Sequence, residues 1–251
     1  MVRRGVLLKE DKKIFVQGAR EIGIELKERQ IEKFSCYLDL LIEWNQKINL
    51  TSFKTPREIL VKHFLDSFTC IKVIELNFNK VKIEIVDVGT GAGFPGIPLK
   101  IIWSSFDLYL IEATKKKIIF LEKVIKELDL KNVQILEGRA ETLGRGQENR
   151  GKYDIAISRA VAPLNILSEY CLPLLKIGGL FIAQKGRLHQ EEMEIGNKVI
   201  QLLGGEITKV EKIKVPFLNQ ERHILVIKKI QDTPFKYPRR EGIPQKRPLC
   251  F

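Results

Sequence analysis

Cysteine and long apolar runs are both scarce in this sequence. Its cysteines form no C-x-x-C pair, so we expect reduced thiols that pack as small apolar side chains, and neither disulfides nor a metal site. No apolar run reaches the ~18 residues that a membrane span requires. The apolar stretch that follows Arg3 and Arg4 is too short for the core of a signal peptide. Together these absences predict a cytoplasmic protein.

Negative charge is also in short supply. Lysine and arginine number 43 and aspartate and glutamate 31, which gives a net charge of +12. Such a surplus attracts polyanions, nucleic acid before anionic membranes. The alternative is a lysine-rich surface that reflects composition alone, with the charge enrichment found in thermophiles. With 251 residues, of which 44% are apolar, the chain suits one domain of ordinary size or one domain with a small appendage.

The first part of the chain shows helical periodicity and no strand pattern. One helix face is predicted from apolar residues at helical spacing, namely Ile31, Phe34, Tyr37, Leu38, Leu41, Ile42 and Trp44. Pro56 fits the first position of a further helix. We expect a helical N-terminal region over residues 1–80, an α/β domain over 81–231 and a basic, proline-rich tail over 232–251. The tail is expected to be extended rather than part of the core.

Short β-branched runs then alternate with amphipathic segments. Five runs, "IEIVDVG", "FDLYLIEA", "VQILEG", "YDIAISRA" and "GGLFIAQKG", alternate with helical patterns, which predicts parallel strands covered on both faces. Two final runs, "EITKVEKIKVP" and "ERHILVIKKI", are joined by a loop too short for a helix, so they should pair antiparallel. This α/β fold, a seven-stranded sheet with an antiparallel final hairpin, looks like the Rossmann-like class I S-adenosylmethionine-dependent methyltransferase fold.

The stretch "VDVGTGAGFPGIP" contains two overlapping glycine motifs. Gly91, Gly93 and Gly96 spell G-x-G-x-x-G, whereas Gly89, Gly91 and Gly93 spell G-x-G-x-G. Both follow a strand, where ligands bind in open α/β sheets. We expect a helix from about Pro98. Pro95 and Pro98 have no N–H group, so the start of this helix lacks donors that a pyrophosphate would need. The G-x-G-x-G register is therefore favoured.

Two acids near these glycines indicate an adenosine cofactor. Glu112 ends the second strand and is placed to accept hydrogen bonds from both ribose hydroxyls, which NAD and S-adenosylmethionine share. The alternative is a solvated acid paired with Lys115 or Lys116. Asp87 precedes the glycines, where it can cap the turn or meet an α-amino group that NAD lacks. Asp87 therefore favours S-adenosylmethionine.

The ends of the third and fourth strands narrow the chemistry. Residues 139–141 lie where an adenine ring could be bound. Arg159 ends the fourth strand, and the loop there faces the transferred methyl in this fold; alternatively, Arg159 pairs with Glu141 or a helix end. The loop has no N-P-P-Y or D-P-P-Y tetrad and no cysteine before Cys171. Methylation of an exocyclic base amine or of cytosine carbon-5 is therefore disfavoured.

Several segments together resemble one family. "WNQKINLTSFKTP", "VKHFLDS", "VDVGTGAGFPGIPLKI", "ISRAVAPL" and "ERHILVIKK" are similar, in order, to the RsmG (GidB) family. The resemblance covers about residues 10 to 230. It implies methyl transfer from S-adenosylmethionine to N7 of a guanine in a loop of 16S ribosomal RNA. The expected partner is that RNA or the small ribosomal subunit, and the enzyme is expected to be a monomer that binds no membrane.

The resemblance also implies cofactor contacts at matching positions. They are Gly89, Phe94, Ala140, Glu141 and Arg159, with Glu112 as the ribose acid; Asp87, Gly91 and Gly93 join them from the glycine loop. Phe94 stands where the family often has leucine, so an apolar or backbone contact is expected. His63 and Asp66 match a segment that brings the N-terminal region against the pocket. His63 and Arg159 are the catalytic candidates, although His63 fits a packing role equally well.

Methylation at N7 requires no general base, because N7 carries a lone pair and no proton. The catalytic demand is in-line placement. N7 lies in the deep groove of A-form RNA, so the target base must be in a loop or flipped out. Candidate phosphate contacts are Arg3, Arg4, Lys115, Lys116, Lys117, Lys236, Arg239, Arg240, Lys246 and Arg247, any of which could instead be simply solvated. A metabolite or protein methyltransferase and an NAD-dependent oxidoreductase remain the alternatives.

Overall fold

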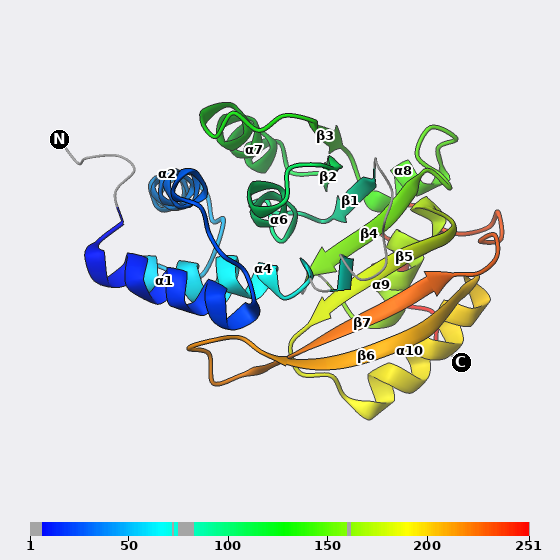
Figure 1. The fold of residues 1–251 in the computed structure, drawn as a ribbon. Coiled ribbons are helices and arrows are strands. Elements are labelled where there is room, and N and C mark those ends of the chain that lie inside the picture. The colour runs from blue at the N-terminus through cyan, green and yellow to red at the C-terminus, as the bar shows by residue number, and fades with distance from the viewer. Residues whose placement is uncertain (1–6, 72, 75–82, 160–161, 251) are drawn as a thin grey trace.

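A seven-stranded sheet forms the centre of the molecule in the computed structural model, which describes residues 7–71, 73–74, 83–159 and 162–250 (Figure 1). Its strand order is β3-β2-β1-β4-β5-β7-β6. The strands are β1 (Glu84–Val88), β2 (Asp107–Glu112), β3 (Val133–Glu137), β4 (Tyr153–Arg159), β5 (Leu175–Lys185), β6 (Gly205–Lys214) and β7 (Glu221–Lys229).

The strand directions confirm the fold predicted from the sequence. Strands β1 to β5 pair parallel, and β7 lies antiparallel between β5 and β6. The chain order reverses between β1 and β4, so the crevice of such a sheet opens at their carboxyl ends. The pairing of Arg159 with Gln184 brings the ends of β4 and β5 to this same edge.

Helices cover both faces of the sheet (Figure 1). They are α1 (Lys9–Ile22), α2 (Glu28–Asn45), α3 (Pro56–Ile59), the π-helix η1 (Leu60–Leu65), α4 (Asp66–Phe68), α6 (Gly96–Ile102), α7 (Lys115–Glu127), α8 (Ala140–Arg145), α9 (Leu164–Cys171), the 3-10 turn η2 (Leu172–Leu174), α10 (Gln190–Leu202) and α11 (Ile243–Lys246). None of the described helices combines the length and apolar character needed to cross a bilayer.

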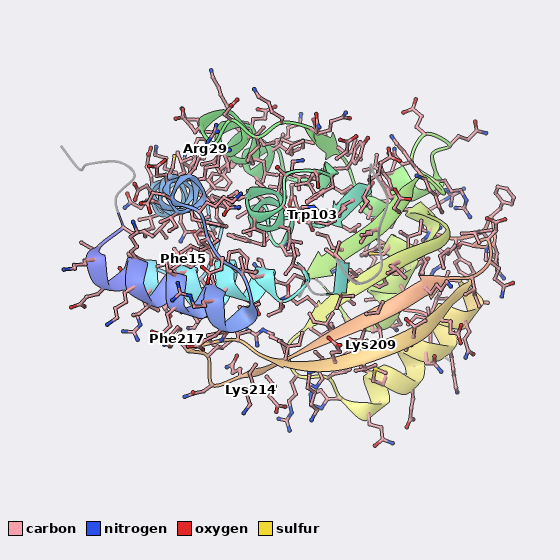
Figure 2. All side chains as sticks on the ribbon, viewed as in Figure 1. Phe15, Arg29, Trp103, Lys209, Lys214 and Phe217 are labelled. Carbon is pink, nitrogen blue, oxygen red and sulfur yellow. The ribbon has the colours of Figure 1, made fainter. Side chains whose placement is uncertain are left out.

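An aromatic cluster joins the N-terminal helices to the sheet. Phe15 of α1 lies 5.1 Å from Phe34 of α2 and 6.0 Å from Phe64 of η1, measured between ring centroids. Figure 2 marks Phe15 on α1. These rings belong to one core with apolar residues of β1 and β2, among them Ile85. The predicted division of the chain at residues 80 and 231 stays a prediction, and residues 75–82 lie outside the described part.

The C-terminal residues pack against the domain, contrary to the extended tail that the sequence suggested. Tyr237 and Thr233 are buried. Arg150 donates to the carbonyls of Thr233 at 2.5 Å and Tyr237 at 2.8 Å. Apart from the short helix α11, the described part of the segment has no regular secondary structure, and single anchor residues hold it. We call residues 232–250 the C-terminal segment.

Candidate functional site

The glycine loop after β1 has the backbone that its sequence requires. Gly89, Gly91 and Gly93 have φ values of 70°, 61° and 97°, which favour glycine over residues with a Cβ. A Cβ at Gly91 would meet nothing closer than the Gly89 carbonyl at 4.0 Å, so this position faces open space. A Cβ at Gly93 would lie 2.6 Å from the hydroxyl of Tyr37. Gly93 therefore permits close packing against α2, whereas Gly89 and Gly91 form the loop surface.

Asp87 caps this loop from beneath. Its Oδ2 accepts hydrogen bonds from Thr90 Oγ1 at 2.7 Å and from the Gly96 N–H at 2.9 Å. Helix α6 begins at Gly96, two residues before the expected Pro98, because this bond holds its first N–H. Asp87 Oδ1 is buried and has no hydrogen-bond partner among the described residues. Burial raises the pKa of Asp87 to about 6, although both hydrogen bonds favour the charged form.

Glu112, at the end of β2, is fixed by backbone donors. Its Oε1 accepts from the N–H groups of Ala113 and Thr114 at 2.9 and 2.8 Å, and its Oε2 accepts from Gly91 at 3.1 Å. A carboxylate has about four acceptor positions. One position on Oε2 thus remains, so the expected bonds to both ribose hydroxyls cannot form unless Gly91 releases its own. The alternative pairing of Glu112 with Lys115 or Lys116 is not observed.

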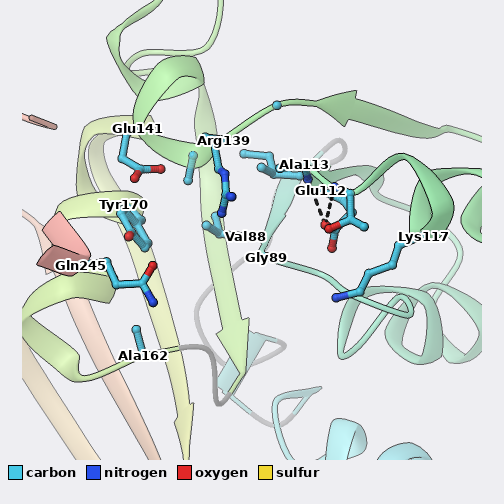
Figure 3. A pocket seen from close by; sticks show the side chains of 14 residues that line it. Val88, Gly89, Glu112, Ala113, Lys117, Arg139, Glu141, Ala162, Tyr170 and Gln245 are labelled. Carbon is cyan, nitrogen blue, oxygen red and sulfur yellow. Dashed lines mark hydrogen bonds between the residues drawn. The ribbon is translucent and has the colours of Figure 1, made fainter. Parts of the chain in front are cut away.

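A cavity of about 280 Å³ lies between the ends of β1, β2 and β3 and helix α9 (Figure 3). Glu112 and Lys117 lie on one side of it, and Tyr170 and Gln245 lie on the other (Figure 3). We call it the first pocket. Its lining comprises Val88, Gly89, Ile111, Glu112, Ala113, Thr114, Lys117, Gly138, Arg139, Ala140, Glu141, Ala162, Tyr170 and Gln245.

Tyr170 and Gln245 were not found by sequence reasoning. Tyr170 hydrogen-bonds to Glu141, and burial with the nearby carboxylates raises its pKa to about 12, so it remains a neutral donor. Glu141 is buried and also accepts from the Gly242 N–H at 3.0 Å. Nothing in "LSEYC" or "GIPQK" marks these residues, because only the tertiary packing of α9 and of the C-terminal segment brings them to the pocket.

A second pocket opens over the ends of β4, β5 and β7, beside the N-terminal helices. It is lined by Phe53, Lys62, His63, Asp66, Arg159, Gln184, Lys185, Gly186 and Arg222. Four of these side chains are cationic and one, Asp66, is acidic. Lys185 Nζ donates at 2.8 Å to the carbonyl of Ala162, which lines the first pocket. The two pockets are therefore neighbours; residues 160 and 161, in the loop expected to face the methyl group, lie outside the described part.

Asp66 holds two arginines at this second pocket. Its Oδ1 accepts from Arg222 at 2.9 Å and its Oδ2 from Arg159 at 3.2 Å. The side chain of Asp66 is 4% exposed, that of Arg222 is 15% exposed and that of Arg159 is 10% exposed. Arg159 thus pairs with Asp66 and not with Glu141. The π-helix η1 leads directly into Asp66, and such irregular turns are frequent at functional sites.

His63 is held as a neutral imidazole. Its Nδ1 lies 2.8 Å from Arg159 Nη2, and because a guanidinium can only donate, Nδ1 must be the acceptor. Nε2 then carries the proton and donates to Thr51 Oγ1 at 2.7 Å. Burial and the Arg159 charge lower the pKa of His63 to about 2. With both nitrogens engaged, His63 is suited to positioning rather than to proton transfer.

Phe94 links the histidine to the glycine loop. Its ring stacks on His63 at 4.3 Å and 12° between planes, and the Arg159 guanidinium lies 4.9 Å from its centroid. Phe94 and Arg159 do not line the first pocket. The predicted cofactor residues are therefore split. Gly89, Glu112, Ala140 and Glu141 line the first pocket, Arg159 lines the second, and Asp87, Gly91, Gly93 and Phe94 line neither of the two.

The predicted phosphate contacts differ in their exposure and in whether they already have a partner. Lys115, Lys116, Lys236, Arg240, Lys246 and Arg247 are exposed, and Lys117 lines the first pocket. Arg239 does not fit a phosphate contact, because its Nη2 bonds at 2.7 Å to Glu169, which is 1% exposed. Arg3 and Arg4 lie outside the described residues.

Residues 30–225 match the family described as GidB, rRNA small subunit methyltransferase G. This chain belongs to that family. It is 47% identical over 240 residues to the ribosomal RNA small subunit methyltransferase G of Alkaliphilus oremlandii, covering 96% of this chain and 99% of that one. The Bacillus subtilis protein of the same name is 46% identical over 235 residues, covering 94% and 97%.

Solved structures support the fold of this GidB-family chain. A putative transferase from Pyrococcus horikoshii aligns with a TM-score of 0.53 at 13% identity, over 66% of this chain and 64% of that one. TrmN from Thermus thermophilus aligns with a TM-score of 0.51 at 13% identity, over 68% and 53%. These similarities concern the fold alone. With family membership they identify the chain as a class I methyltransferase.

Proposed function

We propose that this enzyme transfers a methyl group from S-adenosylmethionine to N7 of a guanine in 16S ribosomal RNA. It would act in the cytoplasm as a monomer, on the RNA or on the small ribosomal subunit. The observation that carries the proposal is the pair of adjoining pockets at the switch between β1 and β4, one lined by the glycine loop and Glu112 and the other by cationic side chains.

The first pocket fits S-adenosylmethionine through its acids. Glu112 Oε2 keeps one acceptor position for a ribose hydroxyl, and Glu141 offers a fixed acceptor to the adenine amino group. Asp87 Oδ1 is a buried acceptor directly beneath the loop, and no described residue bonds to it. An α-ammonium group that reached it would satisfy this orphaned atom, and NAD carries no such α-amino group. This supports S-adenosylmethionine over NAD.

The second pocket suits a flipped guanine. Arginine and lysine are the side chains that most often bind the guanine O6 edge. Arg159, Lys185 and Arg222 line this pocket, and Asp66 fixes two of them. Phe53 offers an aromatic face, with Lys62 Nζ 4.5 Å from its centroid. We propose that these residues orient the base so that N7 points toward the first pocket.

The chemistry then rests on placement. S-adenosylmethionine supplies a methyl group on a positively charged sulfur, which N7 can attack without losing a proton. Because His63 is neutral and its two nitrogens are engaged, its role is to hold Arg159 and Phe94. Arg159 in turn places the base edge. Rate enhancement would come from holding the reacting atoms at near-attack distance.

Cofactor identity is tested by calorimetry with S-adenosylmethionine and NAD. We expect the wild-type chain to bind S-adenosylmethionine and not NAD; binding of NAD alone would sink the proposal. Gly91→Ala should still fold, with a modest loss of stability, because its Cβ has room but its positive φ strains an alanine. It should weaken cofactor affinity several-fold by disturbing the loop that donates to Glu112. Gly178→Ala, also at positive φ (85°) and with no atom within 4 Å, is the control and should leave affinity unchanged.

RNA binding is tested by its salt dependence. Replacing both Lys246 and Arg247 with alanine should reduce the slope of log affinity against log salt by about 0.7 for each phosphate that is no longer neutralised. Lys209→Ala is the control, because this lysine lies on β6 at the outer edge of the sheet (Figure 2). An identical slope in the double variant would count against phosphate binding by the C-terminal segment. Methylation mapping of 16S RNA from cells lacking the enzyme tests the nucleotide.

A further inference from the structure

We propose that the C-terminal segment forms one wall of the cofactor pocket and that Gln245 recognises the N6–N7 edge of the adenine ring. This inference rests on the proposed use of S-adenosylmethionine. The matched family region ends at residue 225, so the segment lies beyond it. We infer the role of the segment from its contacts with α8, α9 and the first pocket.

The segment is anchored at several points along its path. Arg150 binds its carbonyls near the start, at Thr233 and Tyr237. Further on, Arg239 pairs with buried Glu169 of α9 through bonds of 2.7–2.9 Å. Pro238 packs so close to α8 that a Cβ at Gly144 would lie 3.2 Å from its ring. These contacts fix the backbone that carries the following residues.

The anchored backbone reaches the pocket at Gly242. Its N–H donates at 3.0 Å to Glu141 Oε1, the acid at the start of α8. Three residues later Gln245 lines the first pocket beside Tyr170, across from Glu112 (Figure 3). If Glu112 takes the ribose and Glu141 the adenine amino group, Gln245 stands at the adenine end.

The carboxamide of Gln245 matches an adenine edge chemically. It is exposed and has no hydrogen-bond partner within the described residues. A glutamine can accept from the N6 amino group while it donates to N7, which is the bidentate pairing that reads adenine. Glu141, an acceptor only, cannot bind N7. The hydroxyl of Tyr170 is already bonded to Glu141. Glu141 and Gln245 are therefore complementary, and Gln245 supplies an unengaged donor beside Glu141.

The test uses 5′-methylthioadenosine and its 7-deaza analogue, which lacks the N7 acceptor. Affinity is measured by calorimetry on the full-length protein. The wild type should bind 5′-methylthioadenosine about fivefold more tightly than the analogue, as the loss of one hydrogen bond implies. In Gln245→Ala this ratio should fall to about one. The control Gln231→Ala changes an exposed glutamine immediately before the segment and should keep the wild-type ratio.

A chain truncated after Arg240 provides a second, independent test. It keeps the anchors at Thr233, Tyr237 and Arg239 but removes the Gly242–Glu141 and Asn165–Leu249 bonds. The chain should therefore still fold, with a somewhat lower unfolding temperature, and it should lose the same fivefold preference. A preference retained in both Gln245→Ala and the truncated chain would overturn the inference while leaving the proposed function intact. Failure of the wild type to bind either nucleoside or S-adenosylmethionine would instead overturn the proposed function.

Discussion

Replacing Asp66 with alanine should lower the free energy of unfolding by about 3 kcal/mol, because the change leaves two largely buried guanidinium groups without their counter-ion. Arg159 and Arg222 both bind this carboxylate and are 10% and 15% exposed. The expected loss is at the lower end for broken buried pairs, since both arginines retain some contact with water. Urea unfolding monitored by circular dichroism measures it.

Two further variants separate charge from packing at this site. Asp66→Asn keeps the side-chain shape and one acceptor, so its loss of stability should be intermediate. Glu25→Ala breaks the Arg20–Glu25 pair, whose side chains are 66% and 77% exposed, and should change stability very little. If Asp66→Ala proved as mild as Glu25→Ala, Asp66 would not be what confines the two arginines, and the assigned network would be wrong.

The sheet and the glycine loop could be predicted because their signals are local. Each parallel strand is a short β-branched run that stops at glycine or a polar residue, and the helices between them repeat at helical spacing. The positive φ angles of Gly89, Gly91 and Gly93 follow from the same tight turn. Local rules also place Pro56 at the start of α3, where Thr55 accepts from the Glu58 N–H.

The C-terminal segment could not be predicted because its contacts join residues far apart in the chain. Glu169 and Arg239 are 70 positions apart, and Asn165 reaches Leu249 across 84. Neither arginine spacing nor proline content reveals such anchors. One signal existed: Glu169 lies in the apolar helix "LNILSEYC". A buried acid there requires a cationic partner, and the basic segment offers several.

The histidine network escaped sequence reasoning for a different reason. The segment "VKHFLDS" placed His63 and Asp66 near the cofactor, but two roles for the histidine remained equal. The hydrogen bond from Arg159 fixes the tautomer and engages the nitrogen that proton transfer would require, which argues against His63 as a base and leaves its two roles as predictions. That bond joins residues 96 positions apart, so the hydrophobic periodicity of the sequence cannot predict it.

Affinity for S-adenosylmethionine should fall about tenfold between pH 7 and pH 5, with the decline centred on the pKa of Asp87. Burial raises that pKa to about 6, so the carboxylate is mostly ionised at pH 7 and mostly protonated at pH 5. Only the ionised form attracts an α-ammonium group at Oδ1. Asp87→Asn should bind more weakly at pH 7 and should lose the pH dependence.

The proton balance and a matched ligand sharpen this test. At pH 6 binding should release about half a proton, because the ligand shifts Asp87 from half-ionised to ionised; calorimetry in buffers of different ionisation enthalpy measures this release. The ligand 5′-methylthioadenosine lacks the α-amino group, so its affinity should stay level from pH 7 to pH 5. A parallel decline for both ligands would show that the acid effect arises elsewhere in the pocket. A decline confined to S-adenosylmethionine assigns it to Asp87 and so fixes which end of the pocket holds the amino-acid moiety.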